Sequence, residues 1–543
     1  MITFDASPMV YWALAYGLAL IVLWLSQHKR ISTPVYLTVS ILLFVAMRLP
    51  AVVLNRELNA DESQMLSHAL TLFQDPVYWR SVDGTTIGPL DNYLLVLPRL
   101  LGFQLDYTSA RVMSVLCNIG SLLFFFVAMQ RWFGSQTART ALLLPLFFLA
   151  FTQETDFVHY SSEQLPVFLL SICLALLAYL PDGFQANRLS VTAYVFGFVA
   201  GMIPFAKLQA VPQAVILVLG AGYEIWRMHR HSNQIKPFFL LALGGISFPA
   251  LALIWVLWQG VFQDFINFYI LGNAVYAGGS SWSQIPTQFG KLVLLSPDFT
   301  ALLVILAAFQ LASFFTQRKK DATATASDKA LHLPLIIATY SFAALYAATK
   351  SGNLFVHYLA FCVYPLALFG AAAAQRFAFR PLFAILAPLL MLGWFGLDDG
   401  ISFIKKRELN SLVSVEARHL LQSPVVMAMH PFQKSGDQMV VWGWQCRYYV
   451  EAQLAQGTAE NHSERCIFEH PLRDVYRERF IRDMQRNQPA FFLDAVGKNS
   501  LWLQNKDTQG HEIFPELAAY ISTHYQLVED IDDTRLYIRR DRL

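Results

Sequence analysis

Apolar runs long enough to cross a bilayer recur from the start of the chain to about residue 397, and no other feature constrains the fold as strongly. Each run has roughly 17–25 residues, the length that a helix needs to span the hydrocarbon core. Only 14% of the residues are charged, against about a quarter in soluble domains. The sequence therefore predicts an α-helical polytopic membrane protein with about 12 transmembrane helices. The predicted spans are 9–26, 33–50, 107–128, 138–155, 163–180, 189–205, 210–226, 237–258, 296–316, 331–348, 356–374 and 380–397.

Lysine and arginine residues test this topology, because cytoplasmic loops carry an excess of them. Every second gap between the predicted spans is basic, which places both termini outside the cytoplasm. The first apolar run, 9–25, has no basic residue before it and no small-residue cleavage site after it, so we expect a retained helix. The spans on either side of 204–212 have almost no loop between them, and one broken helix is the alternative. The basic gaps contain Lys29, Arg30, Arg131, Arg139, Arg188, Arg227, Arg230, Lys236, Arg318, Lys319, Lys320, Lys329, Arg376 and Arg380.

The largest polar segments lie on the predicted outer side. The gap 51–106 is long and rich in polar and aromatic residues, and we expect it to form an outer loop. After the last span, charges become frequent and short strand-like runs appear. We therefore expect a transmembrane domain over 1–399 and an extracytoplasmic soluble domain of the α/β or α+β class over 400–543. The strand-like runs are 438–442, 490–493 and 535–538.

The five cysteines fall into two groups. Cys117, Cys173 and Cys362 lie inside predicted spans, where we expect buried, small apolar groups. Cys446 and Cys466 lie in the predicted outer domain and can form a disulfide if that compartment is oxidising. Two reduced, buried thiols are the alternative, because a sequence gives no Cα separation.

Acidic residues stand at the edges of predicted spans. Asp61 and Glu62 open the first outer loop, where partial desolvation suits a general base and a second carboxylate can bind a metal or orient a hydroxyl. The alternative is structural, with Asp61 as a helix N-cap and Glu62 in the first turn. Glu163 opens a later span, where a carboxylate is costly unless it has a function or lies solvated at a helix start.

Basic and aromatic residues also stand at predicted outer edges. Lys207 lies alone between two apolar runs, where it can hold a lipid phosphate as a point charge or extend its ammonium to the interface. His357 precedes a late span and can contact a phosphate or an acceptor, or serve as a capped, structural histidine. Nucleotide-binding, zinc-spacing and nucleophile-elbow motifs are not found in the sequence. An activated group at the outer face would therefore arrive on a lipid.

Taken in order, these features resemble the GT-C superfamily of membrane glycosyltransferases, within it the family-39-like enzymes related to protein mannosyltransferases and aminoarabinose transferases. One departure is that Glu163 stands where relatives commonly have Asp followed by Pro, which changes the reach of that carboxylate. The ordered signatures are Asp61-Glu62, Gly88-Pro89-Leu90 with Tyr93, Glu163 with Pro166, Lys207, His357-Tyr358 and Val441-Trp442-Gly443-Trp444.

The resemblance implies an enzyme of the bacterial inner membrane that takes a sugar from a polyprenyl phosphate. The sugar would pass to a lipid, glycan or protein acceptor on the outer face, usually with inversion, and no nucleic acid would take part. The family is divided on metal dependence, so a divalent cation is one option for a cofactor.

The same resemblance assigns roles to individual residues. Asp61 would be the general base or would position the reacting groups, Glu62 would orient the acceptor or a metal, and Glu163 would be the second acidic residue. The remaining assignments are donor-phosphate binding by Lys207, Arg80 and His357, and substrate binding by Tyr93 and Tyr358.

Two other functions fit a chain with this many spans. A secondary transporter would have two similar halves and binding residues near the bilayer midplane, and no such halves are evident in the sequence. A polysaccharide ligase or polymerase would use the same lipid-linked donor but would transfer a whole glycan.

Overall fold

A computed structural model of the chain describes residues 8–185, 189–232, 235–279, 281–315, 329–376, 380–407 and 415–543. Each of the twelve predicted spans coincides with a helix in these ranges, which confirms the predicted fold class. Arg188, Arg318, Lys319 and Lys320, which the topology used, lie outside the described residues. The twelve helices are α1 (Pro8–Gln27), α2 (Thr33–Val53), α5 (Tyr107–Phe133), α6 (Ser135–Phe151), α8 (Gln164–Gln185), α9 (Leu189–Ala206), α10 (Val211–Ser232), α11 (Lys236–Trp258), α15 (Pro297–Phe315), α16 (Lys329–Thr349), α17 (Ala360–Arg376) and α18 (Arg380–Lys406).

The lengths of these helices agree with a multi-pass membrane protein. Nine helices of the described chain are long and apolar enough to cross a bilayer, and a pair bent by 115°, Trp282–Leu295 with Pro297–Ala312, would make a tenth span. Two shorter apolar helices, α6 and α17, add to this set. Since α9 and the stretch Leu208–Arg230 each meet the criteria alone, the alternative of one broken helix is wrong.

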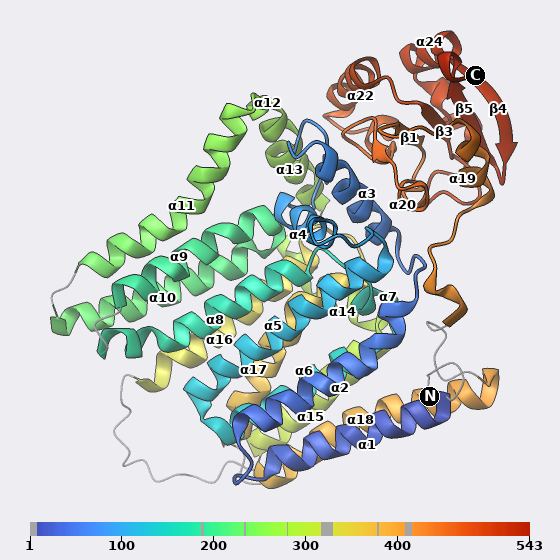
Figure 1. Cartoon of the computed structure of the whole chain (residues 1–543). Coiled ribbons are helices and arrows are strands. Elements are labelled where there is room, and N and C mark those ends of the chain that lie inside the picture. The colour runs from blue at the N-terminus through green and yellow to red at the C-terminus, as the bar shows by residue number, and fades with distance from the viewer. Residues whose placement is uncertain are drawn as a thin grey trace, which may run out of the picture. The chain divides into compact units, whose positions relative to one another are not determined.

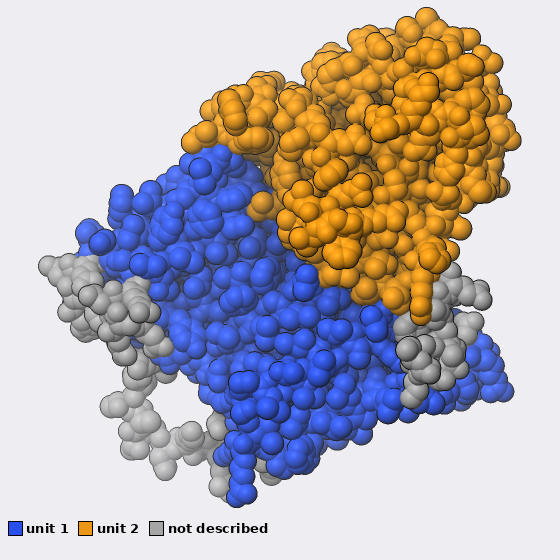
Figure 2. Space-filling model, viewed as in Figure 1, with its two compact units in different colours: residues 1–51, 114–252, 277–415 blue, residues 52–113, 253–276, 416–543 orange. Residues whose placement is uncertain are grey.

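The chain divides into two compact units, which Figure 2 shows in blue and orange. Unit 1 holds most of the long helices, whereas unit 2 combines the first long loop with the C-terminal region. Unit 1 consists of residues 1–51, 114–252 and 277–415, and unit 2 of residues 52–113, 253–276 and 416–543.

Unit 1 is a helical bundle. The helices α8, α9, α10, α16 and α17 pack beside one another along their lengths, as Figure 1 shows. The backbone of a membrane helix satisfies its own hydrogen bonds, which is why a chain of this composition builds its core from helices. The shorter helices of unit 1 are α7 (Thr155–Val158) and α14 (Ile285–Leu295).

Unit 2 contains a five-stranded sheet with the strand order β2-β1-β3-β5-β4. The strand β1 runs parallel to β2 and β3, whereas β5 runs antiparallel to β3 and β4. Three of the strands coincide with the predicted strand-like runs, and the helices between them make this an α/β region. The strands are β1 (Gln438–Trp442), β2 (Ala455–Gln456), β3 (Phe491–Asp494), β4 (Tyr525–Ile531) and β5 (Thr534–Arg539).

The helices of unit 2 come from all three of its segments. Two of them, α3 and α4, form the first long loop, and α12 and α13 belong to the segment 253–276. The others surround the sheet (Figure 1). These helices are α3 (Ala60–Gln74), α4 (Pro89–Leu100), α12 (Phe262–Asp264), α13 (Gly272–Tyr276), α19 (Pro424–Met429), α20 (Arg447–Ala452), α21 (Glu464–Ile467), α22 (Arg473–Asn487), α23 (Lys506–Gln509) and α24 (Pro515–His524).

The two cysteines of unit 2 do not form the disulfide that the sequence offered as one option. Cys446 and Cys466 are free, buried thiols, so the structure has the reduced alternative. Each thiol donates to its own acceptor, Cys446 to the Asn461 carbonyl at 3.5 Å and Cys466 to a Glu460 carboxylate oxygen at 3.6 Å. The cysteines within the predicted spans are also free and buried, as expected.

Glycines allow α9 and α11 to pack backbone against backbone. A Cβ atom added to Gly197 would lie 2.2 Å from the Leu241 carbonyl oxygen, and one added to Gly244 would lie 2.2 Å from the Tyr194 carbonyl oxygen. Small residues at this spacing let membrane helices approach closely, where packing provides most of the attraction. The contact therefore requires glycine on both helices.

We expect Gly244→Ala to lower the melting temperature of the purified protein, because the added methyl group overlaps the backbone of α9 and overpacking costs about 1–3 kcal/mol. Gly222→Ala is the matched control, since a Cβ atom at this position of α10 meets nothing within 4 Å. Thermal unfolding in detergent, followed by intrinsic fluorescence, measures both. Equal melting temperatures for the two variants would contradict the close packing.

Candidate active site

The predicted catalytic and substrate-binding residues divide evenly between the two units. Glu163, Lys207, His357 and Tyr358 belong to unit 1, and each comes from a segment at the end of a long helix. Asp61, Glu62, Arg80 and Tyr93 belong to unit 2.

A buried ion pair joins the first two residues of unit 1. Glu163 immediately precedes α8, and Lys207 occupies the turn between α9 and α10. The Lys207 ammonium donates to a Glu163 carboxylate oxygen and to the Ser162 hydroxyl, the latter at 2.6 Å. The Lys207 side chain is 3% exposed and the Glu163 side chain is 0% exposed. Burial opposes ionisation of the carboxyl, but the charge of Lys207 holds the pKa of Glu163 below its ordinary value.

Aromatic and imidazole rings surround this pair. The Lys207 ammonium lies 5.1 Å from the centre of the Tyr358 ring, within the range of a cation–π contact. The neighbouring His357 places Nδ1 3.0 Å from an Asp156 carboxylate oxygen. Burial would raise the pKa of Asp156, but the hydrogen bond and charge of His357 hold it below its ordinary value. The structure thus brings together Glu163 and Lys207 with both predicted residues at 357 and 358.

Sequence reasoning missed His159 and Asp156 as members of this group. His159 places Nδ1 2.7 Å from the Thr155 carbonyl oxygen, and its ring centre lies 5.9 Å from that of His357. Its Nε2 is buried and has no hydrogen-bond partner within the described parts of the chain. The available signal was position, because both residues lie in the same short gap as Glu163.

Asp61 and Glu62 start the same helix of unit 2 but have different surroundings. Glu62 is fully buried, and its two carboxylate oxygens accept from Nε and Nη2 of Arg111 at 2.7 and 2.6 Å. Asp61 is half-buried. The structural alternative for Asp61 was wrong in detail, because the Asn59 side chain caps α3 by accepting from the Asp61 N–H at 3.0 Å.

Sequence reasoning also missed Glu57, a third carboxylate near the start of α3. The Glu57 carboxylate accepts from the Ser63 hydroxyl. Burial raises the pKa of Glu57 to about 7. A carboxyl group with this pKa can both donate and accept a proton near neutral pH. Its sequence context gives no signal, because Glu57 becomes half-buried only through the packing of unit 2.

Arg80 and Tyr93 occupy ordinary surroundings in unit 2. The Arg80 guanidinium pairs with the Asp75 carboxylate, and both side chains are more than a third exposed. The Tyr93 hydroxyl donates to the Pro76 carbonyl at 2.6 Å. An exposed pair of this kind contributes little to stability, so the Arg80 charge can be redirected to a ligand at low cost.

The architecture is the GT-C fold of membrane glycosyltransferases. No protein-family model and no curated protein matches the chain. Among solved structures, it is similar to ArnT from Cupriavidus metallidurans bound to undecaprenyl phosphate, with a TM-score of 0.56 and 12% identity over 93% of this chain and 98% of that one. The apo state of that ArnT gives a TM-score of 0.53 at 13% identity, covering 93% and 97% of the two chains.

A zinc and sulfate complex of the Archaeoglobus fulgidus oligosaccharyltransferase lies further away, with a TM-score of 0.42 at 10% identity, over 85% of this chain and 68% of that one. The two ArnT matches show a shared fold, and at 12–13% identity the roles of individual residues have to be argued from their own surroundings.

We expect Lys207→Met to destabilise unit 1 strongly, because it leaves the Glu163 carboxylate buried without its counter-ion. Breaking a buried pair in this way costs about 3–5 kcal/mol. The double variant Glu163→Gln/Lys207→Met should recover most of the loss, since no buried charge remains. Thermal unfolding of the single and double variants measures the coupling.

Arg80→Met is the matched control for this experiment. It breaks an exposed ion pair, for which the expected loss is below about 1 kcal/mol. A Lys207→Met variant no less stable than the double variant would show that the Glu163 carboxylate does not depend on the ammonium.

Proposed function

We propose that the chain is a glycosyltransferase that moves a sugar from a polyprenyl-phosphate donor to an acceptor on the outer face of the bacterial inner membrane, with inversion. The observation that carries this proposal is the convergence of Glu163, Lys207, His357 and Tyr358 in unit 1. These residues come from three separate segments of a GT-C fold. The ArnT neighbour was crystallised with undecaprenyl phosphate, a lipid of the class that the proposal requires.

The proposed reaction exchanges one bond at the anomeric carbon for another. The acceptor hydroxyl attacks that carbon, the bond to the phosphate oxygen breaks, and the polyprenyl phosphate leaves with the bonding electron pair. The acceptor proton passes to a carboxylate. Positive charge develops on the sugar ring and negative charge on the leaving phosphate, so a fixed cation beside the phosphate lowers the barrier.

Lys207 supplies that cation in this proposal. Its ammonium is positioned by the Ser162 hydroxyl and the Glu163 carboxylate before any donor arrives. A preorganised charge in a poorly solvated site stabilises the transition state more than a mobile one in water. Tyr358 and His357 lie beside the ammonium and would contact the donor phosphate or sugar.

Asp61 and Glu62 take different roles in this proposal. Asp61, half-buried at the start of α3, is the proposed general base. The bidentate pairing of Glu62 with Arg111 favours a positioning role, because a carboxylate with both oxygens bonded fixes the start of the helix. Arg80 and Tyr93 would contact the substrate from the same unit.

As part of this proposal, unit 1 also binds a divalent metal ion. His159 and His357 each direct Nδ1 to an oxygen acceptor, the arrangement that orients a metal-binding imidazole through its Nε2. The buried, unpartnered Nε2 of His159 among the described residues fits this set. A bound cation would supply charge for the phosphate, with His159 and His357 as its ligands.

We expect Asp61→Asn to reduce sugar transfer by at least about 100-fold, the usual contribution of a general base, without changing the melting temperature. The assay incubates the purified protein with a panel of polyprenyl-phosphate sugars and a crude membrane acceptor, and measures release of the sugar. Asp474→Asn is the control, because this aspartate of α22 has an 85% exposed side chain. Equal transfer by Asp61→Asn and wild type would remove Asp61 from the reaction, whereas no turnover by wild type on any donor would favour a transporter or a ligase.

The metal proposal predicts that His159→Ala lowers the zinc bound per protein chain. The reason is that removal of one imidazole leaves an incomplete ligand set. Elemental analysis after dialysis against zinc, with His430→Ala of unit 2 as the control, measures the stoichiometry. Equal zinc content in wild type and His159→Ala would contradict the site, whatever the transferase activity of either protein.

A further inference from the structure

A hollow of about 510 Å³ lies in the C-terminal region of unit 2. It is formed by the end of α22, the end of α24, and the end of β5 with the segment that follows it. All of these residues lie in unit 2 and within the described range, and the hollow involves no proposed transferase residue. Its volume is in the range of small-molecule sites. The lining residues are Gln485, Gln488, Tyr520, Thr523, His524, Arg539, Arg540 and Asp541.

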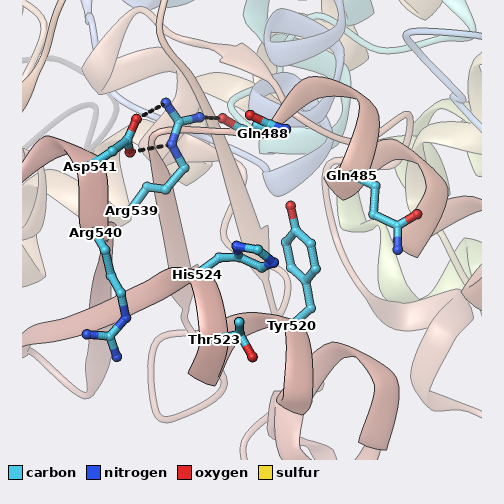
Figure 3. Close-up of a pocket in the computed structure, with 8 residues that line it drawn as sticks. All are labelled: Gln485, Gln488, Tyr520, Thr523, His524, Arg539, Arg540 and Asp541. Carbon is cyan, nitrogen blue, oxygen red and sulfur yellow. Dashed lines mark hydrogen bonds and ion pairs between the residues drawn. The ribbon is translucent and has the colours of Figure 1, made fainter.

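The charges in this hollow do not cancel. Arg539 is fully engaged, because Asp541 accepts from its Nε at 2.6 Å and its Nη2 at 2.9 Å, and the Gln488 carbonyl accepts from its Nη1. Figure 3 shows these three residues joined along one side. Arg540 donates to the Ser522 carbonyl at 3.3 Å and has no carboxylate partner within the described residues. Arg540 therefore presents one uncompensated positive charge.

The remaining wall combines rings with amides. The rings of Tyr520 and His524 lie 4.5 Å apart at an angle of 45°. The Tyr520 hydroxyl donates to the Met484 carbonyl at 3.0 Å, which holds the ring in place. Gln485 is exposed, and its amide has no hydrogen-bond partner among the described residues. A ring face suits C–H groups, and a free amide suits hydroxyl groups.

The backbone at the edge of the hollow is held in an unfavourable conformation. Gln488 has a φ of 44°, in the left-handed region where glycine is usual at the end of a helix. The bond from Arg539 to its carbonyl fixes this turn. Strained residues of this kind persist where the surrounding structure determines them, often at ligand sites.

We propose that this hollow binds an acidic saccharide, with the carboxylate or phosphate of the sugar on Arg540 and its hydroxyl groups on Gln485. Its apolar face would lie on Tyr520. A single free charge is too little for a polyanion that is bound by charge alone, whereas the ring and the amide add the contacts that a sugar offers. This binding is separate from sugar transfer and does not depend on it.

The test measures binding of trigalacturonate to the full-length protein in detergent by calorimetry, with the fully methyl-esterified trimer as the neutral probe. We expect the acidic trimer to bind more tightly than the ester, and Arg540→Gln to weaken it about tenfold through loss of a charge-assisted bond. Lys498→Gln is the matched control, because it removes an exposed charge beyond the opposite end of β3. Tyr520→Phe should retain binding and Tyr520→Leu should weaken it.

Equal affinity for the two trimers, or for wild type and Arg540→Gln, would overturn the proposal. Displacement of the trimer by inorganic phosphate at a similar concentration would make the hollow a simple anion site and overturn the saccharide assignment. Displacement by phosphatidylglycerol vesicles but not by phosphate would assign the surface to a lipid headgroup, and would overturn it as well. The melting temperature of each variant shows whether a loss of binding reflects unfolding.

Discussion

The buried ion pair between Lys207 and Glu163 is the contact around which the other polar groups at this end of unit 1 are arranged. Either charge alone would be costly in so poorly solvated a place, and each is the counter-ion of the other. Unit 2 follows the same rule with Glu62 and Arg111, whose side chains are 0% and 1% exposed. In both of these pairs the two charges come from separate segments of the chain.

This pairing separates residues that hold the site from residues that can act in it. Glu62 has both carboxylate oxygens committed to one guanidinium, so a substrate could reach it only by breaking that contact. Asp61, one position earlier, is half-buried, and its helix start is capped by Asn59. Two adjacent carboxylates therefore differ in their surroundings, because the helix turns one of them into the unit and leaves the other half-buried.

Hydropathy and basic gaps predicted all twelve long helices, because a bilayer imposes length and apolarity on every span directly. Three of the five strands of the C-terminal sheet, β1, β3 and β5, were predicted from their local sequence pattern. Partner choice was not predictable, since Arg111 lies 49 positions from Glu62 and meets it only through packing. The unpartnered Nε2 of His159 and the separate acceptors of Cys446 and Cys466 likewise depend on tertiary contacts.

The proposed transfer makes the buried pair more than a structural device. Lys207 already holds one anion in place, and a donor phosphate that approaches the ammonium brings a second. If the phosphate shares the ammonium with Glu163, the desolvation of Lys207 has been met during folding and need not be met again on binding. The Ser162 hydroxyl keeps the ammonium oriented during that exchange. When the lipid phosphate leaves, the Glu163 carboxylate is at hand to take back its counter-ion, which favours release of the product.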